Sequence, residues 1–348
     1  MPVFFLFFIL ASSYSYAQVK GLYPWLYTSD GQSITILATT ITFMPSDPNL
    51  DPLVIPETIE NLPVKRFGSS DTNTSYLGIN GQENIRSVVL PSTLEVIERK
   101  ALGGLPNLTN IILPPNLKSI GYEAFRGCSK LTSINLPQGL TNIASGAFQG
   151  CRKLNNITLP ALIKNLESWT FADCNNLSTI ELNNSLETIG DYAFIRCSAL
   201  SSINIPSNVT SIGQQAFWAN TSLTNVIVGK NVNWIGWEAF AYCSNLSKVV
   251  FRGTPPNGGV DPFLGSSGTV FYQSNIVGWG SKYPPVGFRG TNGLPTISYS
   301  FSSIKPKIIS FTKTNNLASI SWEAESDQVL STRLPAIVQK NNSLNQSN

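Results

Sequence analysis

The chain has 348 residues, of which 42% are apolar and 12% charged, with five cysteines and no histidine. Its length and apolar share allow a sizeable core, whereas a net charge of +3 is too small to indicate a nucleic-acid groove or a patch for anionic membranes. The absence of histidine excludes a Ser-His-Asp triad, a Cys-His pair and an HExxH zinc motif.

Residues 1–17 have the pattern of a secretory signal peptide. An apolar run at 3–10 precedes Ser15 and Ala17, which fit the small-residue cleavage rule. The run is too short to span a bilayer, and no later stretch reaches the roughly 18 apolar residues required. We therefore expect cleavage after Ala17, a secreted or cell-surface protein and no transmembrane span. The alternative is a buried strand, because no Lys or Arg precedes the run.

Residues 18–78 are expected to form an N-terminal cap. Apolar and polar residues alternate at 33–37 and 40–43, which favours a hairpin, and the segment from Leu53 to Val64 leads into the array that follows. A stack of repeats needs such a cap, because its terminal units have an open face.

Residues 79–251 contain a repeat of 23 residues. Its clearest unit runs from Cys128 to Gly150, and the whole array amounts to about eight units. Six phenylalanines are in register: Phe125, Phe148, Phe171, Phe194, Phe217 and Phe240. One unit cannot bury its apolar residues alone, so neighbouring units must stack.

The spacing within one unit predicts its local structure. The alternation at 133–136 predicts a half-buried strand with Ile134 and Leu136 inside, and Pro137 ends it because proline has no N–H to donate. Leu140 and Ile143 begin a return path. Glycines are then expected to permit a turn with unusual dihedrals, before Ala-Phe and Cys close a short helical turn. These glycines are Gly121, Gly190, Gly213 and Gly236.

The C-terminal part leaves the repeat. Residues 252–293 are expected to form a second cap, with a strand at 269–272 and a turn at 278–280. Residues 294–348 contain strand-like alternation and end in an Asn- and Ser-rich stretch that is typical of a disordered tail.

The unit resembles the BspA-like leucine-rich repeats. Their hallmark L-x-x-I-x-I-P-x-x-V-x-x-I-G-x-x-A-F-x-G-C is present with few changes at 177–197 and 200–217, and the resemblance covers about residues 51–290. It implies a repeat solenoid, a right-handed superhelix of short parallel β-strands and short helical turns, capped at both ends. The sequence departs from the pattern at Thr170, Asn183, Asn220 and Gly229.

The five cysteines occupy one repeat position. Parallel Cα–Cβ vectors disfavour a disulfide between stacked neighbours, so buried free thiols are the favoured interpretation. One or more disulfides along the column and metal binding are the alternatives. The cysteines are Cys128, Cys151, Cys174, Cys197 and Cys243.

The outward side of the predicted strands is a candidate binding surface. Small polar residues dominate it, and repeat proteins use such rigid faces for extended partners; a solvated face without a partner is the alternative. The candidates are Ser133, Asn135, Asn156, Thr158, Thr179, Glu181, Ser202, Asn204 and Asn225.

Four late aromatic residues break the repeat pattern and form a second candidate site. Trp218, Trp234, Trp237 and Tyr242 suit the flat faces of sugar rings or a protein interface. The alternative is that they pack on the C-terminal cap around Trp279.

Catalytic signatures are absent from the sequence. It has no phosphate loop, nucleophile elbow or C-x-x-C pair, and Glu123 and Glu238 share a repeat position five units apart. We therefore expect a non-enzymatic recognition or adhesion module that binds an extracellular protein as a monomer, with no cofactor, metal or nucleic acid. A carbohydrate-binding module and a structural spacer are the alternatives.

Overall fold

The computed structural model describes residues 20–22, 25–39, 51–69, 79, 82–279, 282–283, 294–299, 307–314, 317–324 and 328–333. They belong to two compact units, the first consisting of Met1–Tyr272 with Ile276–Ile297 and the second of Gln273–Asn275 with Ser298–Asn348. The predicted signal peptide, residues 40–43 and the predicted tail beyond residue 333 lie outside the described residues. The described residues contain no helix that could cross a membrane.

The first unit begins with an antiparallel meander. Strands β1 (Lys20–Leu22), β2 (Trp25–Ser29) and β3 (Ile34–Thr39) pair in sequence order, so the hairpin joins β2 to β3. Its turn is closed by Asp30 Oδ1, which accepts the Ser33 N–H at 2.6 Å. β3 then pairs in parallel with β6 (Leu62–Phe67), which links the meander to the repeats, and β5 (Thr58–Ile59) pairs with β6.

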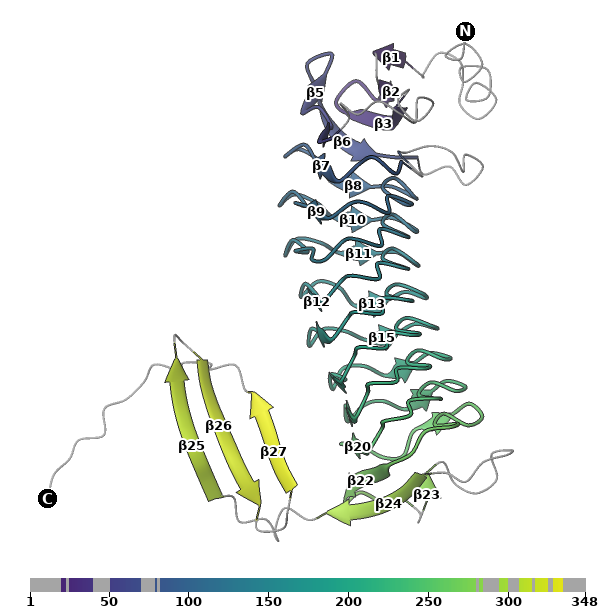
Figure 1. Cartoon of the computed structure of the whole chain (residues 1–348), viewed down its shortest axis with the longest axis vertical. Helices are drawn as coiled ribbons and strands as arrows, with labels where there is room; N and C mark the ends of the chain where they lie inside the picture. The colour runs from purple at the N-terminus through teal and green to yellow at the C-terminus, as the bar shows by residue number, and fades with distance from the viewer. Residues whose placement is uncertain are drawn as a thin grey trace, which may run out of the picture. The chain divides into compact units, whose positions relative to one another are not determined.

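The predicted repeat strands form a parallel ladder, the first ladder (Figure 1). Residues 23 apart are paired, as in Ser202 with Asn225, and the inward residue between them is buried, as is Ile203. The strands are β4 (Leu53–Val54), β7 (Ser87–Val89), β9 (Asn110–Ile111), β12 (Asn156–Thr158), β14 (Thr179–Glu181), β16 (Ser202–Asn204), β18 (Asn225–Val228), β20 (Lys248–Phe251) and β22 (Thr269–Gln273).

The segment 133–136 keeps the predicted alternation without forming a regular strand. Ile134 and Leu136 are buried, and Ser133 and Asn135 are exposed. Its backbone makes no ladder hydrogen bonds with β9 or β12, which interrupts the first ladder at this coil. A second interruption lies between β14 and β16, which do not pair.

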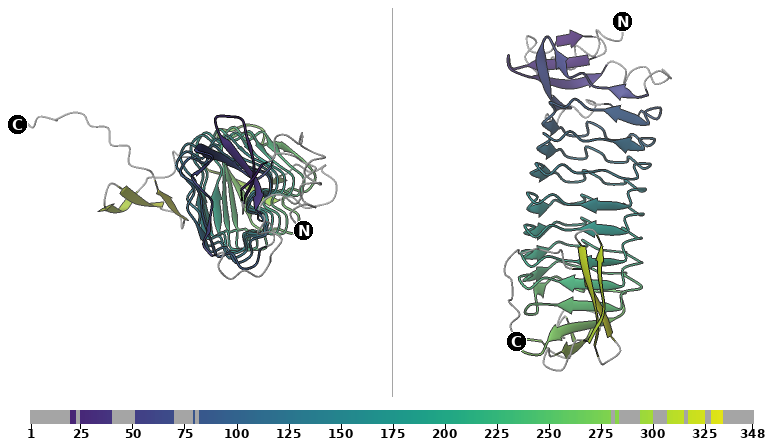
Figure 2. Two further views of the ribbon diagram at one scale, coloured as in Figure 1. Left: turned by 90° about the horizontal axis from the view of Figure 1, so that it is seen from above. Right: turned by 90° about the vertical axis from the view of Figure 1, so that its left-hand side faces the viewer.

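The return path is a second parallel ladder on another side of the coil (Figure 2). Each strand is two residues long, with an outward polar residue and an inward apolar one in most coils. Its strands are β8 (Val96–Ile97), β10 (Ser119–Ile120), β11 (Asn142–Ile143), β13 (Asn165–Leu166), β15 (Thr188–Ile189), β17 (Ser211–Ile212), β19 (Trp234–Ile235) and β21 (Asn257–Gly258). The pairing is interrupted between β11 and β13.

The expected short helical turns are not helices, and this part of the prediction is wrong. Hydrogen bonds alternate between the same coil and the next one: Ala124 N–H donates to Gly121 O at 3.2 Å, whereas Phe125 N–H donates to Ala147 O at 2.8 Å. Two positive-φ residues per coil, such as Glu123 and Gly127, turn the chain so that this alternation is possible. The described residues contain strands and turns but no helix.

The prediction for the four glycines is also corrected. None of them is among the residues with positive φ. Instead, the backbones of neighbouring coils approach closely there: a Cβ on Gly213 would lie 2.5 Å from Asp191 N, and one on Gly236 would lie 2.4 Å from Gln214 N. Glycine is required at these positions because a side chain would hold the coils apart.

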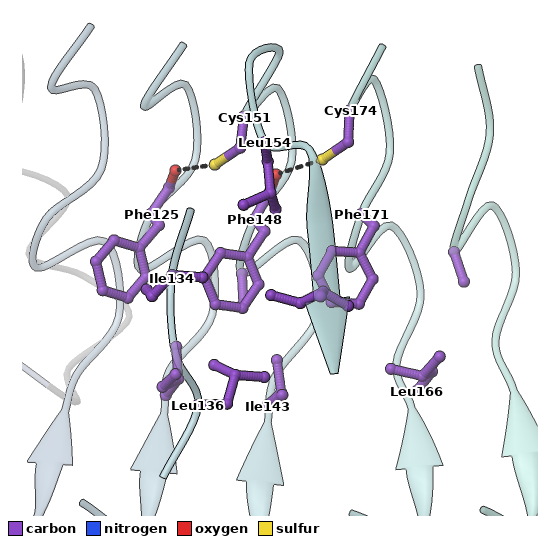
Figure 3. Packing of buried hydrophobic residues seen from close by; sticks show 14 of the residues in the cluster. Phe125, Ile134, Leu136, Ile143, Phe148, Cys151, Leu154, Leu166, Phe171 and Cys174 are labelled. Atoms are coloured by element: carbon purple, nitrogen blue, oxygen red, sulfur yellow. Dashed lines mark hydrogen bonds between the residues drawn. The ribbon is translucent and has the colours of Figure 1, made fainter. Parts of the chain in front are cut away.

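The core is built from columns of identical side chains (Figure 3). The six phenylalanines stack on one another, with ring centroids 5.0 Å apart for Phe217 and Phe240 and 5.6 Å for Phe171 and Phe194. All five cysteines are buried free thiols, as the favoured interpretation predicted. Each Sγ–H donates to the carbonyl 26 residues earlier, as in Cys151 to Phe125 at 3.2 Å.

Three of the four departures from the repeat pattern are accommodated locally. Asn183 Nδ2 donates to Pro160 O at 2.6 Å, and the buried Thr170 hydroxyl donates to Glu167 O at 2.7 Å. A Cβ on Gly229 would lie 2.3 Å from Pro206 O, so a close approach explains this residue. Asn220 is fully buried in the cysteine column, and neither side-chain polar atom has a hydrogen-bond partner.

The C-terminal end of the first unit continues the ladder. β22 pairs with β20, and β24 (Leu294–Tyr299) and β23 (Lys282–Tyr283) follow at the edge. Trp279 packs against Phe251 and Tyr272, and its Nε1–H donates to Gly253 O at 3.2 Å. The second unit is an antiparallel sheet of β25 (Lys307–Thr314), β26 (Leu317–Ala324) and β27 (Gln328–Arg333).

Candidate functional site

The outward side of the first ladder, the strand face, carries all nine residues singled out from the sequence. Every one of them is exposed. Seven lie on β12, β14, β16 and β18, whereas Ser133 and Asn135 lie on the neighbouring irregular segment. Thr158 Oγ1 donates to Glu181 Oε2 at 3.2 Å, and this bond links two adjacent coils. The ladder therefore presents these side chains at fixed spacing.

The N-terminal part of the strand face is apolar. Val54, Val89 and Ile112 form a row across β4, β7 and the coil of β9, and their exposed fractions are 55%, 48% and 79%. A groove of about 410 Å³ passes over this region and is lined mainly by residues 87–90 and 110–115. Their exposure follows from the alternation along the chain, because the preceding residues Val88 and Ile111 are buried.

The second ladder presents another polar face, which the sequence analysis did not single out. Its outward side chains bond to each other between coils: Asn142 Nδ2 donates to Ser119 Oγ at 3.0 Å, and Thr188 Oγ1 donates to Asn165 Oδ1 at 2.7 Å. These bonds occupy part of the hydrogen-bonding capacity of this face.

The aromatic candidates divide into two arrangements. Trp218 and Tyr242 make an edge contact with ring centroids 5.4 Å apart. Trp234 lies on β19 and Trp237 follows it, and their exposed fractions are 48% and 46%. These two indoles are therefore not buried beneath the C-terminal cap. The sequence analysis also missed the stacked pair of Trp169 and Tyr192, whose centroids are 4.2 Å apart.

Glu123 and Glu238, the two carboxylates that share a repeat position, are engaged in other contacts. Glu123 is buried and binds Arg126 at 3.0 Å and Lys100 at 3.4 Å. Glu238 accepts a hydrogen bond from Gln215 Nε2 at 2.7 Å. Among the described residues, no group of His, Cys, Asp and Glu could hold a metal ion.

Coils of 23 residues with two parallel ladders and columns of Phe, Leu and Cys define a leucine-rich-repeat solenoid. The sequence model of the BspA-type leucine-rich repeat region matches six copies at residues 79–180 and 141–263, which together cover more than half of the chain. The chain belongs to the BspA-type leucine-rich repeat family. The resemblance seen in the sequence and the predicted repeat solenoid are both confirmed.

Solved structures of leucine-rich repeat proteins are similar to this chain. A leucine-rich cell surface protein from Faecalibacterium prausnitzii is 22% identical, with a TM-score of 0.54 over 73% of this chain and 76% of that one. A leucine-rich repeat protein from Bacteroides ovatus is 23% identical, with a TM-score of 0.47 over 74% and 77%. The leucine-rich repeat protein of T. pallidum is 24% identical, with a TM-score of 0.40 over 71% and 88%. No curated protein matches the chain.

Proposed function

We propose that this chain is a secreted or cell-surface recognition and adhesion module, without enzymatic activity, that binds an extracellular protein through the strand face. The observation that carries the proposal is that all nine polar candidates are exposed on the same side of successive coils, seven of them on parallel strands. Rigid, evenly spaced hydrogen-bonding groups suit an extended partner, because little conformational entropy is lost when they are engaged. The cell-surface description of the Faecalibacterium structure supports the location.

Photo-crosslinking tests which face binds. The full chain carries a benzophenone side chain at Thr158 on the strand face or, as a matched control, at Asn165 on the second ladder. Both positions are exposed and belong to one coil. After incubation with extracellular proteins of the native environment, Thr158 is expected to yield a discrete adduct and Asn165 none. An adduct from Asn165 alone would show that the second ladder, and not the strand face, contacts the partner.

The purified adduct partner then permits a binding measurement. The bulky neutral changes Thr158→Tyr and Asn204→Tyr are expected to abolish its binding sterically, whereas Asn142→Tyr and Asn165→Tyr on the second ladder leave it intact. Thermal unfolding of each variant checks that the fold is retained. Equal binding by both pairs of variants would contradict the proposal.

A carbohydrate-binding role is a second candidate, because Trp234 and Trp237 are almost half exposed. Exposed indole faces can stack on sugar rings. On a glycan array, Trp237→Ala should abolish any such binding, and binding that survives the loss of Trp218, Trp234 and Trp237 together would contradict this role. The alternative of a structural spacer predicts no ligand in either assay.

A further inference from the structure

Charged side chains are distributed unevenly around the coils that follow Cys128. Each coil has a strand-face half, which passes through the first ladder to the next turn, and a second-ladder half, which contains the second ladder and the positive-φ turn. Between residues 129 and 266, the strand-face half comprises 129–139, 152–162, 175–185, 198–208, 221–231 and 244–254.

The strand-face half carries six cations and one carboxylate, Glu181. Within the described part of the chain, none of these cations forms an ion pair. The cations are Lys130, Arg152, Lys153, Lys230, Lys248 and Arg252.

The second-ladder half has the opposite composition, with two cations and six carboxylates. Both cations are paired there: Lys164 Nζ lies 2.9 Å from Glu187 Oε1, and Arg196 Nε lies 2.5 Å from Asp173 Oδ1. The small net charge of the whole chain therefore conceals a positive half and a negative half in these coils.

The six cations form two clusters. Lys130, Arg152 and Lys153 are exposed on two adjacent coils, just before their strand segments. Lys230, Lys248 and Arg252 belong to two later coils. The nearest coils of the two clusters are three strand spacings apart along the stack, about 15 Å at roughly 4.8 Å per spacing. The first cluster precedes its strands whereas Lys230 and Arg252 follow theirs, so an extended polypeptide that reaches both clusters also crosses the strand face. The two coils of the second cluster also carry the half-buried Ile227 and Val250, which are paired neighbours on β18 and β20.

We propose that the partner bound by the strand face is an acidic polypeptide segment, extended along the first ladder with carboxylates at both clusters. This inference rests on the proposed function. Unpaired cations on one side raise the local concentration of an anionic partner and accelerate its association. Ile227 and Val250 offer contacts to aliphatic side chains, whereas the exposed indoles suited to sugars lie in the second-ladder half. These two facts favour a polypeptide over an anionic polysaccharide.

Fluorescence anisotropy with labelled poly-L-glutamate tests the proposal on the full chain. Arg152→Gln with Lys153→Gln removes two strand-face cations and should weaken binding about tenfold at low salt. Lys164→Gln with Arg196→Gln removes the same charge from the second-ladder half and should leave binding unchanged within about twofold. Raising the salt from about 50 to 300 mM should weaken binding by the unmodified chain, since it shortens the screening length.

Three other outcomes would contradict the proposal of an acidic partner. Equal weakening by both double variants would indicate that binding depends on net charge and not on the strand-face half. Absence of poly-L-glutamate binding at low salt would contradict the acidic partner directly. Tighter binding of heparin than of poly-L-glutamate would indicate an anionic polysaccharide. None of these results affects the crosslinking test, in which neutral, bulky substitutions report on the face itself, so the two proposals can fail separately.

Discussion

The thiol of Cys197 donates a hydrogen bond to the backbone carbonyl of Phe171, with Sγ and O 3.1 Å apart, although the two residues are 26 positions apart in sequence. The other four cysteines make the same bond to the preceding coil, and Ser266 makes it to Phe240 with its hydroxyl at 2.7 Å. At six of the seven positions from Cys128 to Ser266, the column therefore holds a small side chain that also donates a hydrogen bond. Packing volume alone does not describe it.

Asn220→Cys should stabilise the protein by about 1–3 kcal/mol. Asn220 stands in this column with two buried polar atoms unpaired, and an unpaired buried group costs free energy that a hydrogen-bonded one does not. By the register of the column, a thiol there would reach the carbonyl of Phe194. Chemical denaturation measures the change, and Asn220→Ser is the matched variant because Ser266 already makes the bond. A loss of stability in both variants would indicate that the amide binds a buried water.

Stability should decrease at alkaline pH because of the buried thiols. Burial raises the pKa of Cys128 and Cys243 to about 12 and also raises that of the other three cysteines. In the unfolded chain, thiols ionise near pH 8.5. Above that pH the unfolded state binds fewer protons than the folded state, so each thiol lowers the free energy of unfolding by about 1.4 kcal/mol per pH unit until its folded pKa is reached.

The variant Cys128→Ser isolates this effect, because a hydroxyl keeps the donor and does not ionise in this range. Its free energy of unfolding, measured by denaturation from about pH 8 to 11, should fall less steeply than that of the unmodified chain. Parallel curves would contradict the raised pKa of Cys128.

Gly236→Ala should destabilise the protein by about 2 kcal/mol or more. Its Cβ would lie 2.4 Å from Gln214 N and 2.5 Å from Gly213 C, and these backbone atoms can move only if the coils separate. Gly139→Ala is the control, since its Cβ would first meet the flexible Lys118 Nζ at 3.2 Å and should change stability by no more than about 0.5 kcal/mol. Thermal unfolding compares the two, and equal effects would refute the close-approach explanation.

Ala219→Gly should have the opposite sign and stabilise by about 0.5–1 kcal/mol. Ala219 has φ of 55°, in the left-handed region where a Cβ is strained, and glycine occupies the same repeat position at Gly127 and Gly150. Ala199→Gly is the control, because Ala199 is not among the positive-φ residues and glycine relieves no strain there. Glycine only increases the conformational freedom of the unfolded chain, so the free energy of unfolding should fall. Denaturation midpoints that move in the same direction would contradict the argument.

The stacked repeat, its inward columns and the outward position of the nine strand-face residues are predictable from the amino-acid sequence. A period of 23 residues, repeated in register, leaves one way to bury Phe, Leu and Cys together. The alternation at 133–136 placed Ile134 and Leu136 inside, although this coil forms no regular strand.

The second ladder, the turns, the exposure of the indoles and the two charged halves depend on contacts between coils and on the path of each coil. Strands as short as Asn142–Ile143 are too brief for a periodic signal, and their pairing depends on a neighbouring coil 23 residues away. The turns are not helical because alternate N–H groups donate to the next coil. Lys153 and Lys164 are 11 residues apart in sequence and lie in different halves, since the path of each coil decides which way a side chain faces.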